Sequence, residues 1–145
     1  MRGSDLKNLA GLVHLQRLVI VGSSRLKALD GVEQLKALRE LLLVLVTGIT
    51  SLKPLASLTG LTDLCVEGGF SKLLRFPTLQ SLAPLHSLTR LRLASIRIDD
   101  RSLQPLHGLE ALRDVFIAKA FPAQEFRLLA RALPHASGLW LDDYR

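Results

Sequence analysis

Six similar units follow one another along this chain at a nearly constant spacing. Each unit has three leucine-like residues at steps of three and a fourth after a step of two. The second of these residues is found at Leu15, Leu38, Leu61, Leu88, Leu112 and Ala136. The steps between units are therefore 23, 23, 27, 24 and 24 residues, and more than half of the chain's 35 leucines fall on the pattern. A repeat of this period indicates a solenoid whose stacked units share one core.

The final step of two in each unit predicts a short strand, because alternate residues of an extended chain point to the same side. Steps of three do not fit a strand and indicate a chain that turns inward about every three residues. One unit cannot bury its own leucines, so the strands of neighbouring units must form a parallel sheet over a shared aliphatic core. We expect the strands near residues 16–21, 39–44, 62–67, 89–94, 113–118 and 137–142.

Proline-containing phrases connect several of the units. They read ITSLKPLASL at 49–58, LQSLAPLHSL at 79–88 and IDDRSLQPLHGL at 98–109. These phrases resemble those of the leucine-rich repeat (LRR) family, in the short 22-residue class of the bacterial-style internalins and the phosphatase-regulating repeat proteins. The resemblance covers residues 6–142 and implies an α/β fold. That fold is a curved right-handed superhelix, here a single domain, 1–145, of about six repeats, with short parallel β-strands on its concave face.

Two features depart from the pattern of this family. An asparagine normally stands three residues after the last strand leucine, but here these positions hold Ser23, Val46, Gly69, Ile96, Ala120 and Tyr144. We expect backbone hydrogen bonds or water molecules to replace the missing amides. The 27-residue step contains the insertion EGGFSKLLRFPTLQ at 67–80, for which an irregular convex loop is favoured over a loop placed for partner contact.

The two ends of the array differ from its middle. Apolar residues follow helical spacing between Pro122 and Leu133, which predicts a helix on the convex face. The segment HASGLWLDDYR at 135–145 predicts a last strand whose charged end acts as a partial cap. No comparable polar cap precedes Leu12, so we expect this end to continue into a larger protein or to pair with a partner.

Residue types that carry catalysis are scattered over the repeat pattern. The histidines, at 14, 86, 107 and 135, fall in four different units, so no metal cluster is expected. Cys65 has no basic neighbour in sequence that would lower its pKa, although Arg92 is its equivalent in the next unit. Gly68 and Gly69 are followed by FSKLL and not by the residues of a phosphate-binding loop. We therefore predict a non-enzymatic protein with no catalytic site, no metal site and no cofactor.

Hydropathy and charge narrow the choice of partner. No apolar run approaches the ~18 residues of a membrane span, and the N-terminus has no signal-peptide core. We therefore expect a soluble cytoplasmic protein that contacts no membrane. The net charge of +6 leaves nucleic acid or another acidic partner open as an alternative. The basic residues are scattered over connections without interleaved aromatic residues, so a solubilising convex surface is favoured.

Strand residues that interrupt the leucine pattern form two rows on the predicted concave face. The first row is mostly apolar and consists of Val19, Leu42, Cys65, Arg92, Phe116 and Trp140. The second row lies two positions earlier and consists of Arg17, Glu40, Asp63, Arg90, Asp114 and Gly138. An exposed apolar stripe favours a binding surface, although strand propensity alone also selects such residues. The second row favours a ladder of cross-strand ion pairs over direct recognition.

The predicted function is therefore protein–protein interaction through the concave face, with a protein or peptide as the partner. The residues predicted to bind it are Val19, Leu42, Arg90, Arg92, Phe116 and Trp140. By resemblance to the family, such an array would serve as the recognition segment of a larger protein. Two alternatives stay open. One is the binding of nucleic acid or another acidic partner through the basic residues, and the other, implied by the phosphatase-regulating proteins, is regulation of an enzyme.

Overall fold

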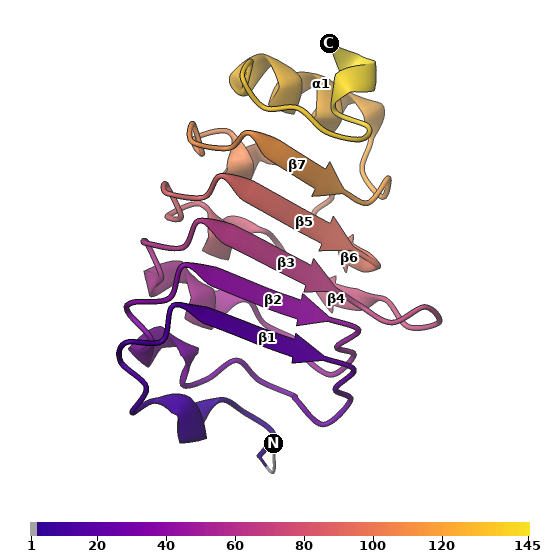
Figure 1. Ribbon diagram of the computed structural model, residues 1–145. Coiled ribbons are helices and arrows are strands. Elements are labelled where there is room, and N and C mark those ends of the chain that lie inside the picture. The colour runs from indigo at the N-terminus through magenta and orange to yellow at the C-terminus, as the bar shows by residue number, and fades with distance from the viewer. Residues whose placement is uncertain (1–2) are drawn as a thin grey trace.

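The chain forms a stack of coils, each of which contributes one strand to a parallel sheet (Figure 1). The computed structural model describes residues 3–145. Its main sheet has five strands in the order β1-β2-β3-β5-β7. They are β1 (Arg17–Val21), β2 (Glu40–Val44), β3 (Asp63–Glu67), β5 (Arg90–Ala94) and β7 (Asp114–Ile117). All five lie within the ranges expected from the repeat, and each pairs with its neighbour in the register that the repeat predicts.

Short 3₁₀ helices on the side opposite the sheet explain the three-residue steps of the leucines. They are η1 (Lys7–Leu9), η2 (Val32–Gln34), η3 (Lys53–Ser57), η4 (Gln80–Leu82) and η5 (Gln104–Leu106). A further 3₁₀ helix, η6 (Asp142–Tyr144), follows the last turn and contacts α1. In the segment before β3, the amides of Leu55, Leu58 and Leu61 each donate to the carbonyl oxygen of the leucine three residues earlier, at 3.0 Å. A 3₁₀ turn repeats every three residues, so successive leucines point the same way, into the coil.

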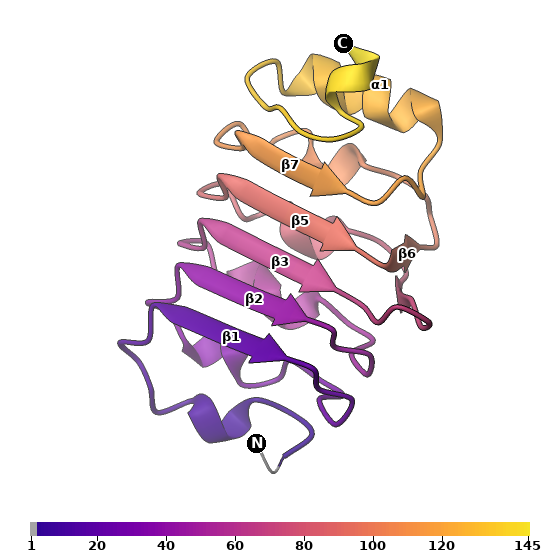
Figure 2. The same ribbon diagram turned by 45° about the vertical axis from the view of Figure 1, so that its right-hand side comes forward.

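The leucines fill a continuous core between the sheet and the layer of 3₁₀ helices, and the turned view shows these two layers (Figure 2). In β2, Leu41 and Leu43 are fully buried, whereas Leu42 between them is partly exposed. Complete burial of a leucine contributes roughly 1.5–3 kcal/mol. No polar or charged side chain among residues 3–145 is buried with them. The aliphatic core therefore decides which strand residues face outward.

The insertion at 67–80 adds a second, smaller sheet. Its strand β4 (Leu74–Phe76) pairs in parallel with β6 (Ile96–Ile98), near the carboxyl ends of β3 and β5 (Figure 1). Between β3 and β4, residues 68–73 form a loop that projects from the stack (Figure 1). The insertion is thus partly a strand and only partly the irregular loop that its sequence favoured.

Backbone hydrogen bonds link neighbouring turns beside the positions where the family has asparagine. The amide of Gly22 donates to the carbonyl oxygen of Val44 at 2.9 Å, and that of Gly68 donates to Ala94 at 3.0 Å. Val46, which occupies one of the asparagine positions, is fully buried and adds to the core. Main-chain bonds therefore hold the turns together, as expected from the missing amides.

Helix α1 (Ala123–Ala132) forms where helical spacing predicted it and covers the last coil (Figure 2). Phe126 and Leu129 form its buried face. The carboxylate of Glu125 accepts a hydrogen bond of 2.6 Å from the amide of Leu103, which fixes the helix against the coil before it.

The sixth predicted strand, at 137–142, does not form. Only Ser137 bridges to the sheet, opposite Asp114. Gly138 follows with a φ of 153°, and its amide donates to the carboxylate of Asp142 at 3.1 Å. The amide of Asp142 donates in return to the carbonyl oxygen of Gly138, also at 3.1 Å. These two bonds close a turn, so the alternating apolar residues after Gly138 do not extend the sheet.

Candidate functional site

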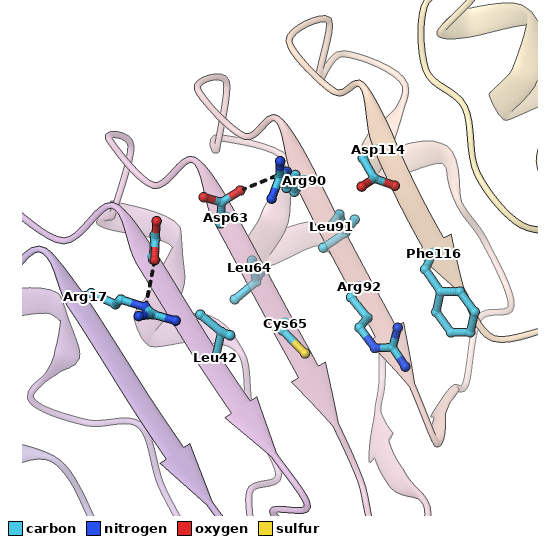
Figure 3. A pocket seen from close by; sticks show the side chains of 11 residues that line it. Arg17, Leu42, Asp63, Leu64, Cys65, Arg90, Leu91, Arg92, Asp114 and Phe116 are labelled. Carbon is cyan, nitrogen blue, oxygen red and sulfur yellow. Dashed lines mark ion pairs between the residues drawn. The ribbon is translucent and has the colours of Figure 1, made fainter.

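A hollow of about 550 Å³ lies on the concave face of the sheet (Figure 3). Its lining comes mainly from alternate strand positions, because the leucines between them point into the core. Four of the six residues predicted to bind a partner line this hollow. They are Leu42, Arg90, Arg92 and Phe116.

The floor of the hollow is apolar throughout, with small and aliphatic side chains at one end and an aromatic ring at the other. Leu42 and Cys65 lie side by side on β2 and β3, and both are half-buried. Phe116, on β7, is also half-buried and closes the far end. The strands thus bring together apolar side chains from residues far apart in the sequence (Figure 3).

Arg92 divides this floor and is held on two sides. Its guanidinium carbon lies 4.5 Å from the centroid of the Phe116 ring, in cation–π geometry. Its Nε lies 3.6 Å from a carboxylate oxygen of Glu67. Arg92 lines the hollow and its side chain remains 52% exposed, so the guanidinium is accessible and can donate to a bound group.

Ion pairs border the apolar floor, as the second row predicted. The Nε of Arg17 lies 2.9 Å from a carboxylate oxygen of Glu40, and that of Arg90 lies 3.9 Å from Asp63 (Figure 3). The pairs are exposed, so each contributes little to stability, typically ~0.2–1 kcal/mol. Asp114, the next residue of the row, has no ion-pair partner in the described part of the chain. Its exposed carboxylate is therefore available to a basic group.

The environment of the Cys65 thiol disfavours its nucleophilic, deprotonated form. Burial raises the pKa of the Cys65 thiol, and this effect outweighs the positive charge of Arg92, which lowers it. The carboxylate of Glu67 raises it further. The thiol is therefore protonated at neutral pH and reacts slowly.

Val19 and Trp140, the two other predicted binding residues, do not line the hollow. Val19 stands in register beside Leu42, but on the edge strand, where it is 45% exposed. Trp140 lies in the turn that replaces the sixth strand, with a φ of 72°, and the Nζ of Lys119 sits 4.6 Å from its ring centroid. Trp140 therefore does not continue the row, because the chain leaves the sheet at Gly138.

Sequence reasoning missed that Asp114 stays outside the ladder of ion pairs. It assigned this residue to the ladder, but Arg90 pairs with Asp63 on its other side. The next coil offers Ser137, and not a basic residue, opposite Asp114. The sequence does not indicate whether Arg90 forms its ion pair with Asp63 or with Asp114.

Metal-ligand types do not gather in the structure. Among residues 3–145, no three side chains of histidine, cysteine, aspartate or glutamate are close enough to hold a metal ion. Within the same residues, no helix combines the length and the apolar composition that crossing a membrane requires.

Parallel strands on a concave face, 3₁₀ turns behind them and an aliphatic core built from a regular leucine repeat together define a leucine-rich repeat solenoid. Solved structures with this fold include an internalin of Listeria monocytogenes, similar with a TM-score of 0.60 and 23% identity over 79% of this chain. A second is internalin C2 of the same organism, with a TM-score of 0.58 and 26% identity, also over 79% of this chain.

The likeness is one of structure more than of sequence. No protein-family model matches the chain, and no curated protein matches it by sequence. The chain spans 30% of the length of the first internalin and 50% of the second. The two internalins therefore establish the fold, and the site must be interpreted from its own residues.

Proposed function

We propose that this protein binds an extended segment of a protein partner in the concave hollow, alone or as the recognition segment of a larger protein. The observation that carries the proposal is the combination of an apolar floor with a carboxylate that has no ion-pair partner among residues 3–145. Leu42 and Cys65 offer apolar surface, and Asp114 offers charge, within one hollow. Binding sites of this kind are largely apolar, with a few polar groups that set orientation.

The lining indicates the chemistry of the bound segment. An apolar side chain would rest on Leu42 and Cys65, and a basic side chain would meet Asp114. Arg92, already held by Phe116 and Glu67, would donate to a carbonyl oxygen of the segment. Little ordering of the arginine is then lost on binding, which favours affinity.

Nucleic acid fits this face less well. The guanidinium groups of Arg17, Arg90 and Arg92 each lie within 4 Å of a carboxylate, so the concave face carries no concentrated positive charge. The sheet also lacks the row of aromatic residues on which successive bases would stack. We also infer a non-catalytic function, and burial of the Cys65 thiol agrees with it, because burial raises the pKa of this thiol and disfavours its nucleophilic form.

Affinity capture with mass spectrometry would identify the partner, and calorimetry would then measure its affinity for variants. Phe116→Ala removes the aromatic support of Arg92 and should weaken binding about tenfold or more. Asp114→Asn should weaken it less, with a reduced dependence on salt. Lys53→Ala, on the opposite side of the solenoid, is the matched control and should leave the affinity unchanged. Unchanged affinity in both Phe116→Ala and Asp114→Asn, with the fold intact, would exclude the hollow as the binding site.

A further inference from the structure

The loop at 68–73 exposes the most accessible aromatic side chain of the protein. Phe70 is 94% exposed, whereas Phe76, Phe121 and Phe126 are buried. Leu73, three residues on, is 56% exposed. Both side chains lie on the loop that projects beyond the carboxyl ends of the main strands, between β3 and β4 (Figure 1).

This loop is held in shape and does not hang loosely from the solenoid. The amide of Gly69 donates to the carbonyl oxygen of Lys72 at 3.0 Å, which closes a turn at the tip. The amide of Leu74 donates to Ser95 at 2.9 Å, and β4 then pairs with β6. A Cβ added to Gly68 would lie 2.4 Å from the carbonyl oxygen of Ser95, so the base of the loop is closely packed. The fold therefore holds the Phe70 ring exposed to solvent, although burial of an aromatic ring would be favourable.

Basic side chains surround the base of the loop. Arg75 and Arg97 stand directly opposite each other on β4 and β6, an arrangement of like charges that weakens strand pairing. Arg75 is compensated by Asp99, whose carboxylate oxygen lies 2.6 Å from its Nε. Arg97 and Lys72 have no ion-pair partner among residues 3–145.

A hollow of about 290 Å³ joins the apolar and the basic residues. Leu73, Arg97 and Arg101 line it together. Asp99 also lines this hollow, but its carboxylate pairs with Arg75. Asp100, the next residue, accepts a hydrogen bond of 3.0 Å from the amide of Ser102. The loop thus has an apolar tip and a base with an excess of positive charge.

We propose that the loop at 68–73 docks this protein on an anionic lipid surface. Phe70 and Leu73 would enter the boundary between headgroups and acyl chains, and Lys72, Arg97 and Arg101 would contact the headgroups. A bilayer surface accepts a protruding apolar tip without a matching pocket, and its negative charge attracts nearby cations. The sequence-based expectation of no membrane contact rested on the lack of a spanning segment, which does not bear on a surface contact.

Other partners fit the tip less well. A protein interface of ordinary size buries about 800 Å² on each side, far more than a six-residue loop presents. Single-stranded nucleic acid is bound by several aromatic rings in succession, and this loop carries one. The lipid proposal is independent of the concave hollow and goes beyond the proposed function.

Sedimentation with lipid vesicles tests the proposal on the whole chain. The protein should bind vesicles of phosphatidylcholine with about one-third phosphatidylserine, and should not bind pure phosphatidylcholine. Phe70→Ala should lower the partition coefficient about tenfold or more. Leu73→Ala should lower it less, and Leu139→Ala is its matched control, because Leu139 is also 56% exposed but lies in the turn near the carboxyl end.

The charge contribution needs a control of its own. Arg97→Gln should lower binding about fivefold, whereas Lys53→Gln, which makes the same change of net charge on the convex side, should have little effect. Insertion of the tip can be followed with Phe70→Trp in a Trp140→Phe background. Its fluorescence should shift to the blue with anionic vesicles and stay unchanged with neutral ones.

Three results would overturn the proposal. The first is a wild-type protein that binds neither type of vesicle. The second is equal loss in Phe70→Ala and Leu139→Ala, or in Arg97→Gln and Lys53→Gln, which would indicate general adsorption. The third is a soluble protein partner whose affinity falls in Phe70→Ala while vesicle binding does not change. The concave-face variants Phe116→Ala and Asp114→Asn should leave vesicle binding unchanged, so the failure of one proposal does not imply the failure of the other.

Discussion

The two ends of the coil stack are finished in different ways. At the carboxyl end, the ring of Phe126 stacks on Tyr144 with centroids 5.5 Å apart and meets Phe121 edge-on at 6.2 Å. At the amino end, Leu12 and Val13 are 50% and 53% exposed. The carboxyl end therefore packs aromatic residues that the repeat does not contain, whereas the amino end leaves residues of the repeat about half exposed to solvent.

This difference shows what a repeat can and cannot supply. An inner coil is covered on both sides by copies of itself, so leucines alone are enough to pack it. A last coil is covered on one side only, and it is closed here by a helix and a turn whose residues break the pattern. Regularity of sequence and closure of an end therefore require different residues, and each can be tested separately.

The largest loss of stability is expected from a substitution in the middle of the stack, and the losses at the two ends are compared with it. Leu61 is fully buried, and Leu61→Asp would place a carboxylate without a partner in the aliphatic core. We expect a loss of more than about 4 kcal/mol, enough to unfold the array. Far-UV circular dichroism and thermal unfolding measure this loss of folded structure. Thr59→Asp, two residues earlier and exposed, should remain folded; a folded Leu61→Asp protein would contradict the stacking of the coils.

The next largest effect is expected at the closed end. Phe126→Ala removes the ring that packs on both Phe121 and Tyr144, and should cost about 3–5 kcal/mol. Hydrogen exchange should show lost protection in α1 and η6 while β1 to β3 stay protected, because each coil contacts mainly its neighbours. Gln124→Ala, on the exposed side of the same helix, is the control. Uniform loss of protection along the whole chain would show that the closed end does not behave as a separate unit.

The inner coils could be predicted from the sequence because one physical rule repeats there. Each strand must bury the same two positions, so the spacing alone placed Leu42, Arg92 and Phe116 in one row. The same rule failed at Trp140, since alternating apolar residues look like a strand wherever they occur. What ends the sheet is the contact of Gly138 with Asp142, which spacing does not encode.

The partner-facing residues were predictable only in part, for a different reason. Position in the row follows from the period, but the choice of ion-pair partner follows from side-chain geometry. Arg90 could meet Asp63 or Asp114 from its place on β5, and the structure shows it with Asp63. The exposed tip at Phe70 was likewise hidden in the insertion, because its sequence does not reveal how rigidly the turn is held.

A glycine at each end offers a closer comparison of the two. A Cβ on Gly138 would lie on the carbonyl oxygen of Val115, and its φ of 153° is unfavourable for other residues. Gly138→Ala should therefore destabilise the protein by about 1–3 kcal/mol in urea unfolding. A Cβ on Gly11 meets no atom within 4 Å, so Gly11→Ala should be neutral or stabilise by about 0.4–1 kcal/mol. Equal losses at both positions would show that backbone strain does not distinguish the ends.

The smallest loss of stability is expected at the amino end, where side chains of the first coil are partly exposed to solvent. Leu12→Ala removes a side chain that is 50% exposed and should cost about 1 kcal/mol or less. Leu35 occupies the same position of the next unit but is fully buried, so Leu35→Ala should cost about 2–5 kcal/mol. Urea unfolding of the two variants compares one repeat position with and without a covering coil. If Leu12→Ala costs as much as Leu35→Ala, then Leu12 is covered in solution, and the contrast between the two ends disappears.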